Sequence, residues 1–202
     1  MKTPYIGDKI PKRGNRFSRI LGQLILTLLG WRFEGEDPAN LPKYVLVVAP
    51  HTSNWDGLVG FTALFAMGMN INWMGKHTLF KGILGKVMRW LGGVPIKRDT
   101  RHGFVEQLIE QFHAREKFVL AITPEGTRKK VTKWKTGFYY IAFEAKIPIV
   151  LAFLDYGRKS LGFGPLIEIS GDLERDLQTI QTFFTKITAR HPENFGMDIQ
   201  SS

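Results

Sequence analysis

The sequence predicts an α/β fold in which a largely parallel or mixed sheet is flanked by helices. Continuous apolar runs, such as residues 44–49 and 118–123, are typical of strands that are buried on both faces. Stretches with helical spacing of apolar residues separate these runs along the chain. Strands that alternate with helices favour a layered α/β domain, and the 202 residues are enough for one such domain.

The remaining elements follow from the same patterns. Strands are expected at residues 44–49, 71–74, 94–97, 118–123, 147–154 and 166–170. Helices are expected at residues 54–67, 79–91, 100–116, 137–145 and around 177–187. For the helix at 79–91 we expect core packing, with lipid contact as the alternative. Binding sites in such folds lie beyond the carboxyl ends of the strands, so we look there for polar side chains.

Composition limits the classes of function. The chain has no cysteine, which excludes disulfides, zinc–thiolate sites, iron–sulfur clusters and a cysteine nucleophile. Its formal net charge is +10. Such an excess favours a polyanionic partner, either nucleic acid, an anionic membrane or a phosphorylated substrate, although a solvated basic surface would give the same count.

The N-terminal stretch predicts an amphipathic helix. Apolar residues recur at helical spacing between Phe17 and Phe33, but the run is too short to span a bilayer. A cationic helix of this kind lies in a membrane interface, and packing on the protein's own core is the alternative. We therefore divide the chain into residues 1–33, a basic segment with an amphipathic membrane-contacting helix, and residues 34–202, the α/β domain. The basic flanks of the helix are Lys12, Arg13, Arg16, Arg19 and Arg32.

A first polar cluster directly follows the strand at 44–49. Ser53 and Asp56 have the spacing of a capping box, with Ser53 as the N-cap of the next helix. His51 then lies just upstream in the loop, within reach of the Asp56 carboxylate. A carboxylate on one imidazole nitrogen makes the other more basic, so His51 is a candidate general base for an alcohol. An ordinary capping loop with an incidental histidine fits the spacing equally well.

Two further clusters are rich in cations. Residues 123–130 form a Pro-Gly turn after the strand at 118–123, and Arg128 offers a planar fork that suits a phosphate. Glu125 beside these cations is a structural or hydroxyl-binding partner, while a charged surface turn is the alternative for the whole stretch. Residues 92–99 are the third candidate, with Arg98 at a strand end. Nucleotide-binding glycine loops, a serine nucleophile elbow and metal-ligand spacing do not occur in the sequence, so no metal site is expected.

In this order the clusters resemble the motifs of the glycerolipid acyltransferase family, whose best-known members are 1-acylglycerol-3-phosphate acyltransferases. His51–Asp56 matches the family's His-x4-Asp motif, and Pro124–Arg128 matches its Pro-Glu-Gly-Thr-Arg motif letter for letter. Gly92–Arg98 resembles the second motif, and Ile147–Val150 resembles the fourth. The resemblance spans residues 44–154, within the region that we divide off as the acyltransferase domain.

The resemblance implies an O-acyltransferase of phospholipid biosynthesis. His51 would deprotonate the acceptor hydroxyl, and Asp56 would orient His51. The acyl donor would be a thioester substrate, acyl-CoA or acyl-carrier protein, with no further cofactor. The acceptor would be a lyso-lipid such as 1-acylglycerol-3-phosphate; Lys129 and Lys130 depart from the family pattern, so another lyso-lipid is an alternative. The implied substrate-binding residues are Arg98, Glu125, Gly126, Thr127 and Arg128.

The same resemblance sets the expected location and partners. The enzyme would sit on the cytoplasmic face of a membrane as a peripheral or monotopic protein. Its partners would be the lyso-lipid, the thioester donor and an anionic membrane surface, without nucleic acid. A non-catalytic basic module that binds anionic membrane is the competing hypothesis, but it leaves the His-x4-Asp and Pro-Glu-Gly-Thr-Arg motifs unexplained.

Overall fold

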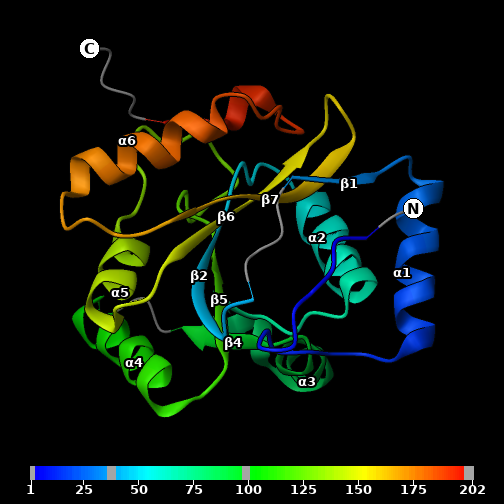
Figure 1. Ribbon diagram of the computed structural model, residues 1–202, viewed down its shortest axis with the longest axis horizontal. Helices are drawn as coiled ribbons and strands as arrows, with labels where there is room; N and C mark the ends of the chain where they lie inside the picture. The colour runs from blue at the N-terminus through cyan, green and yellow to red at the C-terminus, as the bar shows by residue number, and fades with distance from the viewer. Residues whose placement is uncertain (1–2, 36–39, 97–100, 198–202) are drawn as a thin grey trace.

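A seven-stranded sheet lies between two layers of helices (Figure 1). The structure is a computed structural model that describes residues 3–35, 40–96 and 101–197. The strands are β1 (Arg32–Gly35), β2 (Lys43–Val48), β3 (Asn72–Lys76), β4 (Gly93–Ile96), β5 (Phe118–Ile122), β6 (Ile149–Asp155) and β7 (Ser160–Ile167). The helices are α1 (Arg16–Leu28), α2 (Asn54–Met67), α3 (Gly82–Trp90), α4 (Arg101–Ala114), α5 (Gly137–Ala145) and α6 (Leu173–Phe184), with short 3-10 turns η1 (His77–Phe80) and η2 (Pro192–Asn194).

The sheet is mixed, as the sequence predicts. Its strand order is β1-β7-β6-β2-β5-β3-β4. The five strands from β6 to β4 are mutually parallel, whereas β7 runs antiparallel to β6 and parallel to β1. The carboxyl ends of β2, β3, β4, β5 and β6 therefore meet at one edge of the sheet.

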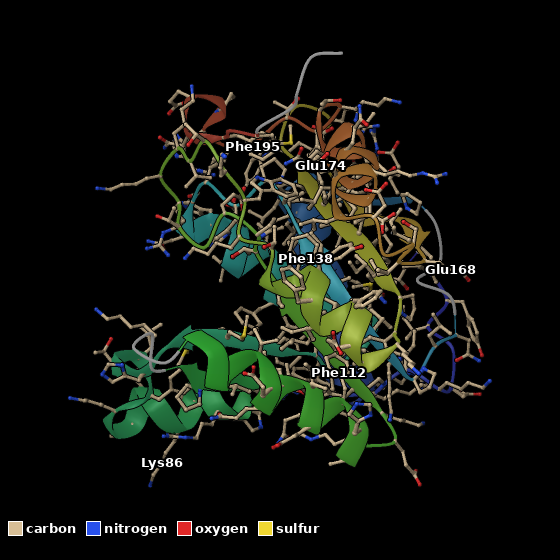
Figure 2. All side chains as sticks on the ribbon, turned by 90° about the vertical axis from the view of Figure 1, so that its left-hand side faces the viewer. Lys86, Phe112, Phe138, Glu168, Glu174 and Phe195 are labelled. Carbon is tan, nitrogen blue, oxygen red and sulfur yellow. The ribbon has the colours of Figure 1, made fainter. Side chains whose placement is uncertain are left out.

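Both faces of the central strands are buried, which explains their unbroken apolar sequences. In β2, Val45 and Val47 join the core beneath α4, α5 and α6. The alternate residues Tyr44 and Leu46 join a second core beneath α1 and α2. Figure 1 shows α4 and α5 on one side of the sheet and α1 and α2 on the other. In Figure 2, the labelled Phe138 belongs to the first of these cores.

Two predicted elements are wrong in part, and one strand was not predicted. The strand expected at 166–170 is β7, which occupies Ser160–Ile167, because its two internal glycines break the apolar pattern. The helix expected at 79–91 is divided into η1 and α3, and Gly82 at the division has a positive φ of 58°. β1 was not predicted because its four residues are mostly polar. The helix expected at 100–116 is α4, and the first residue of the expected range lies outside the described residues.

The expected core packing of the segment 79–91 is also wrong. Ile83 is 83% exposed and Leu84 is 55% exposed, and Gly85 is the one buried residue of α3. Phe80, in the preceding turn, is the apolar residue of this segment that reaches the interior.

α1 forms within the predicted stretch but ends at Leu28, before Phe33, which lies in β1; the helix lies against α2. Its N-cap Asn15 accepts from the backbone N–H of Ser18 in a capping box. A Cβ at Gly22 would lie 2.8 Å from the backbone nitrogen of Ala66, so the glycine permits close packing of the two helices. Leu26 is fully buried, but Phe17 is 73% exposed and Leu28 is 77% exposed. In the described parts of the chain no helix is long and apolar enough to cross a bilayer.

Candidate active site

Polar residues gather at the carboxyl edge of three adjacent parallel strands. His51 follows β2, Glu125 follows β5, and Tyr156 follows β6. Because β2 lies between β5 and β6, the histidine sits between the other two side chains. Hydrogen bonds connect all three strand ends through Asp56 and the backbone of His51.

Asp56 occupies the first turn of α2 with its carboxylate turned back toward the loop. Ser53 is the N-cap, and the capping box expected from the sequence is present. The Oδ2 atom of Asp56 accepts from the backbone N–H groups of Thr52 and Ser53, each at 2.8 Å. These two bonds hold Oδ2 of the carboxylate from within its own loop.

His51 and Asp56 form the pair that the sequence predicts. The Nδ1 atom of His51 lies 3.3 Å from Oδ2 of Asp56, whose side chain is 4% exposed. Burial opposes the ionisation of Asp56, but hydrogen bonds from His51, Tyr156 and Ser53 outweigh it and hold its pKa below the ordinary value. An ionised Asp56 holds Nδ1 as the donor and leaves Nε2 as the basic nitrogen. The imidazole is 22% exposed, so a substrate hydroxyl can reach it.

Glu125 lies against the backbone of the histidine rather than its ring. Its Oε1 atom accepts from the N–H of His51 at 2.9 Å. The other oxygen, Oε2, is buried without a hydrogen-bond partner among the described residues. Burial is the main cause that raises the pKa of Glu125 to about 7, and the nearby charge of Asp56 adds to it. A carboxyl with one oxygen unpartnered beside His51 is suited to bind a hydroxyl group.

The other residues of the Pro-Glu-Gly-Thr-Arg turn shape its outer side. Gly126 has a φ of 64°, a conformation that favours glycine, and Lys135 lies over it. The hydroxyl of Thr127 accepts from the N–H of Lys129 at 3.3 Å, which steadies the turn. Arg128 is exposed, and its guanidinium has no ion pair among the described residues. Arg98 lies outside the described residues, so its predicted place beside this turn stays a prediction.

Tyr156 was missed in the sequence. Its hydroxyl donates to Oδ1 of Asp56 at 2.8 Å, and burial together with this bond raises the pKa of the phenol. The residue directly follows a strand that the apolar pattern identifies, so the rule that sites lie at carboxyl strand ends was sufficient to find it.

Arg190 was missed as well, and no local signal marks it. Its guanidinium lies 5.6 Å from the ring centre of Tyr156 and 5.3 Å from that of Trp55. Together with Lys159 these residues line a cavity of about 170 Å³ next to the Asp56 carboxylate. The C-terminal segment is tied to the site by the N–H of His191, which donates to the hydroxyl of Thr52 at 3.1 Å.

No described group of three or more acidic or histidine side chains is placed to hold a metal ion. The fold and the pair of His51 with Asp56 define the class of the protein: an α/β protein with a histidine–aspartate pair at the carboxyl edge of its sheet. The profile of the acyltransferase family matches residues 31–152, more than half of the chain, and the chain belongs to this family.

Two curated relatives carry more specific names. A "Probable 1-acyl-sn-glycerol-3-phosphate acyltransferase" of Mycoplasma pneumoniae is 31% identical over 147 residues, which cover 67% of this chain and 54% of that protein. A 1-acyl-sn-glycerol-3-phosphate acyltransferase of Limnanthes alba is 23% identical over 152 residues, with coverages of 73% and 52%. The chain thus spans about half the length of these relatives.

A solved structure shares the fold. The 1-acyl-sn-glycerophosphate (LPA) acyltransferase PlsC from Thermotoga maritima superimposes with a TM-score of 0.58 at 19% identity. The match covers 85% of this chain and 78% of that chain. The expected α/β architecture is therefore that of a known acyltransferase.

Proposed function

We propose that the protein moves an acyl group from a thioester donor to the hydroxyl of a lyso-lipid of the 1-acylglycerol-3-phosphate type. The observation that carries this proposal is the approach of Nδ1 of His51 to Oδ2 of the buried Asp56, with the imidazole still accessible. The names of the two curated relatives support the acceptor class. Acyl-CoA and acyl-carrier protein are both thioester donors that fit the reaction, and its diacylated product would serve phospholipid biosynthesis.

The proposed reaction uses the pair without a covalent acyl-enzyme. Nε2 of His51 takes the proton of the acceptor hydroxyl, and the oxygen of this hydroxyl attacks the carbonyl carbon of the thioester. Asp56 stabilises the imidazolium that forms. The tetrahedral intermediate then loses the thiolate, which receives the proton from His51. The new ester and the free thiol leave the site, and His51 returns to its neutral state.

The acceptor head group has two partners in this proposal. Arg128 projects from the turn after β5 without an ion pair among the described residues, and a guanidinium fork binds phosphate through paired charged hydrogen bonds. The free Oε2 of Glu125 accepts from an acceptor hydroxyl nearer to His51. Arg98 joins Arg128 if its strand-end position brings it to the same edge.

A lipid acceptor requires contact with a membrane, and α1 is suited to provide it. Its exposed apolar face includes Phe17, Leu24 and Leu28, and no acidic residue occurs between Lys9 and Phe33. A basic amphipathic helix of this kind lies in the interface of an anionic bilayer. We accordingly place the protein at the cytoplasmic face of a membrane as a peripheral or monotopic enzyme.

The test is thiol release in the presence of a panel of lyso-lipids, with acyl-CoA and acyl-carrier protein supplied separately. We expect release that depends on the acceptor and that is lost in His51→Ala. Release that is the same with and without acceptor would identify a hydrolase. No release with either donor, from a folded protein that binds vesicles, would favour the non-catalytic membrane module.

A further inference from the structure

α3 presents an apolar face to solvent beside the site. Ile83 is 83% exposed, Trp90 is 62% exposed, and Leu84 and Val87 are also exposed. A globular protein normally turns such a helical face toward its core, and a contiguous exposed apolar patch marks an interaction surface. Gly85 lets α3 pack closely on the preceding turn, because a Cβ there would lie 2.1 Å from the carbonyl oxygen of Phe80.

The charges around α3 have one sign. Lys81 and Lys86 are exposed, and Figure 2 shows Lys86 extending away from the body of the molecule. From residue 57 to residue 98 the sequence contains lysine and arginine but no aspartate or glutamate. An apolar helical face whose own segment carries cations and no acidic residue is complementary to an anionic lipid surface.

The same charges argue against a second copy of the chain as the occupant. In a two-fold contact each surface meets its own duplicate. Lys81 and Lys86 would then approach their counterparts in the other copy, with no carboxylate in the segment to separate them.

α3 is joined to α1 through direct contacts at its C-terminal end. Arg13, just before α1, lies 5.3 Å from the ring centre of Trp90, and its Nη2 donates to the Trp90 carbonyl oxygen. Phe65 of α2 stacks on Trp90 with ring centres 5.8 Å apart. Leu58 of α2 is a further exposed apolar residue, with 55% of its surface accessible.

α3 also begins at the edge of the sheet where the site lies. β3 ends at Lys76 and passes directly into η1 and α3. Because β3 is parallel to β5, and β5 to β2, the carboxyl end of β3 shares an edge with His51. The start of α3 therefore lies at the same edge of the sheet as the histidine.

We propose that α3 is a second lipid-docking helix, which inserts Ile83, Leu84, Val87 and Trp90 into the interface of an anionic bilayer. Together with α1 it gives the protein two points of attachment to the membrane. A single attached helix would let the protein rotate about that helix, whereas two attached helices fix the orientation of the carboxyl edge. This inference rests on the membrane contact in the proposed function and assigns a specific helix to it.

The absence of cysteine gives a direct test. Ile83→Cys, labelled with an environment-sensitive fluorophore, carries its label at one site only. The matched control is Tyr140→Cys on α5, where an aromatic side chain is 48% exposed. With phosphatidylglycerol vesicles we expect a blue-shifted, stronger emission at position 83 and no change at position 140. With phosphatidylcholine vesicles the response at position 83 should be much weaker.

Three results of the labelling would overturn the proposal. One is an unchanged signal at position 83 while a label at Leu24→Cys on α1 responds to the same vesicles, since α1 would then dock alone. Another is a blue shift at position 83 that rises with protein concentration in the absence of vesicles, which would identify a second copy as the occupant. An equal response at positions 83 and 140 would mean unspecific adsorption.

A pair of substitutions separates docking from catalysis. We expect Ile83→Gln with Leu84→Gln to weaken vesicle binding roughly ten- to a hundred-fold, given the apolar area removed from the interface. The control pair, Tyr140→Gln with Phe143→Gln, should bind as the parent does. Acyl transfer to a short-chain acceptor, supplied below its critical micelle concentration, should be unchanged in both pairs.

Loss of this activity in the α3 pair would show that the face serves the reaction or the fold. Vesicle binding without any acyl transfer by the parent would contradict the proposed function and leave the docking inference standing.

Discussion

The two oxygens of the Asp56 carboxylate hold different partners: Oδ1 accepts from the hydroxyl of Tyr156 at 2.8 Å, and Oδ2 lies 3.3 Å from Nδ1 of His51. The backbone N–H groups of Thr52 and Ser53 also donate to Oδ2. The carboxylate is thus fixed by its own loop and by a strand end 100 residues further along the chain. Because Asp56 cannot turn without breaking these bonds, the direction of the imidazole is set by the fold.

Tyr156→Phe should weaken this arrangement without removing any group that contacts the reacting atoms. We expect kcat to fall by about tenfold with little change in the KM of either substrate, because a hydrogen bond to a charged group is worth about 1.5–3 kcal/mol. Steady-state kinetics with each substrate varied in turn measures the effect on kcat separately from the effects on the two KM values.

The stability of Tyr156→Phe checks the same bond independently. The bond favours the ionised form of Asp56 and helps to hold its pKa below the ordinary value of 3.8. Its contribution is complete above pH 3.8 and is lost as the pH falls through the lower pKa of the folded state. The difference in Tm between parent and variant should therefore disappear at acid pH. A difference that persists there would mean that Tyr156 contributes to stability through packing alone.

His51→Ala should abolish transfer while the protein stays folded. General-base catalysis contributes about 10²–10⁴ to a rate, so turnover should fall by at least that factor. The control is His113→Ala, an exposed histidine of α4 that lies outside the site. Circular dichroism and thermal unfolding establish that both variants fold. Turnover of His51→Ala within threefold of the parent would contradict the proposed mechanism.

The part of the site that could be predicted from sequence is the part built by local contacts. Ser53 and Asp56 form a capping box across three residues, and His51 adjoins it, so a short pattern contains the whole arrangement. Tyr156 and Arg190 reach the same carboxylate region from distant segments. Their positions depend on strand order, which no spacing along the chain specifies.

The fold shows the same limit. The strands with unbroken apolar sequences were predicted because burial on both faces leaves that pattern, whereas the glycines of β7 obscure it. For α3 the helical spacing was correct but its environment was not: a stripe of apolar residues is the same whether protein or lipid covers it. The division at residue 33 and the substrate roles stay predictions.

Glu125→Gln should change the pH dependence of stability. A pKa raised from 4.5 to about 7 means that the folded carboxyl keeps a proton that the unfolded one has lost. The free energy of unfolding of the parent therefore declines as the pH rises from 4.5 to about 7, by on the order of 3 kcal/mol over the whole range. Glutamine lacks this titration and can still accept from the N–H of His51. Between pH 5 and pH 8 the Tm of the variant should rise relative to the Tm of the parent. A constant difference in Tm across that range would contradict the raised pKa of the buried carboxyl.

Substitution on α1 tests the first docking helix without disturbing the core. Deleting the helix would expose the core around Leu26, which is fully buried, so a surface change is cleaner. Leu24→Gln with Leu28→Gln should reduce binding to anionic vesicles roughly ten- to a hundred-fold, because both side chains are largely exposed in the protein. The same α5 pair, Tyr140→Gln with Phe143→Gln, is the control. Vesicle sedimentation at moderate salt that is equal to the parent's would favour α1 as a purely structural helix.

Arg128→Lys should weaken use of a phosphorylated acceptor. Lysine keeps the charge but not the paired hydrogen bonds of the guanidinium fork, and bonds of this kind are each worth about 1.5–3 kcal/mol. The acceptor kcat/KM should fall roughly ten- to a hundred-fold, while the donor KM stays within twofold. The control is Arg175→Lys, an exposed arginine of α6. A rise in donor KM with an unaltered acceptor KM would place Arg128 on the thioester side. An equal loss with an uncharged acceptor would mean that the arginine holds the turn after β5 rather than a phosphate.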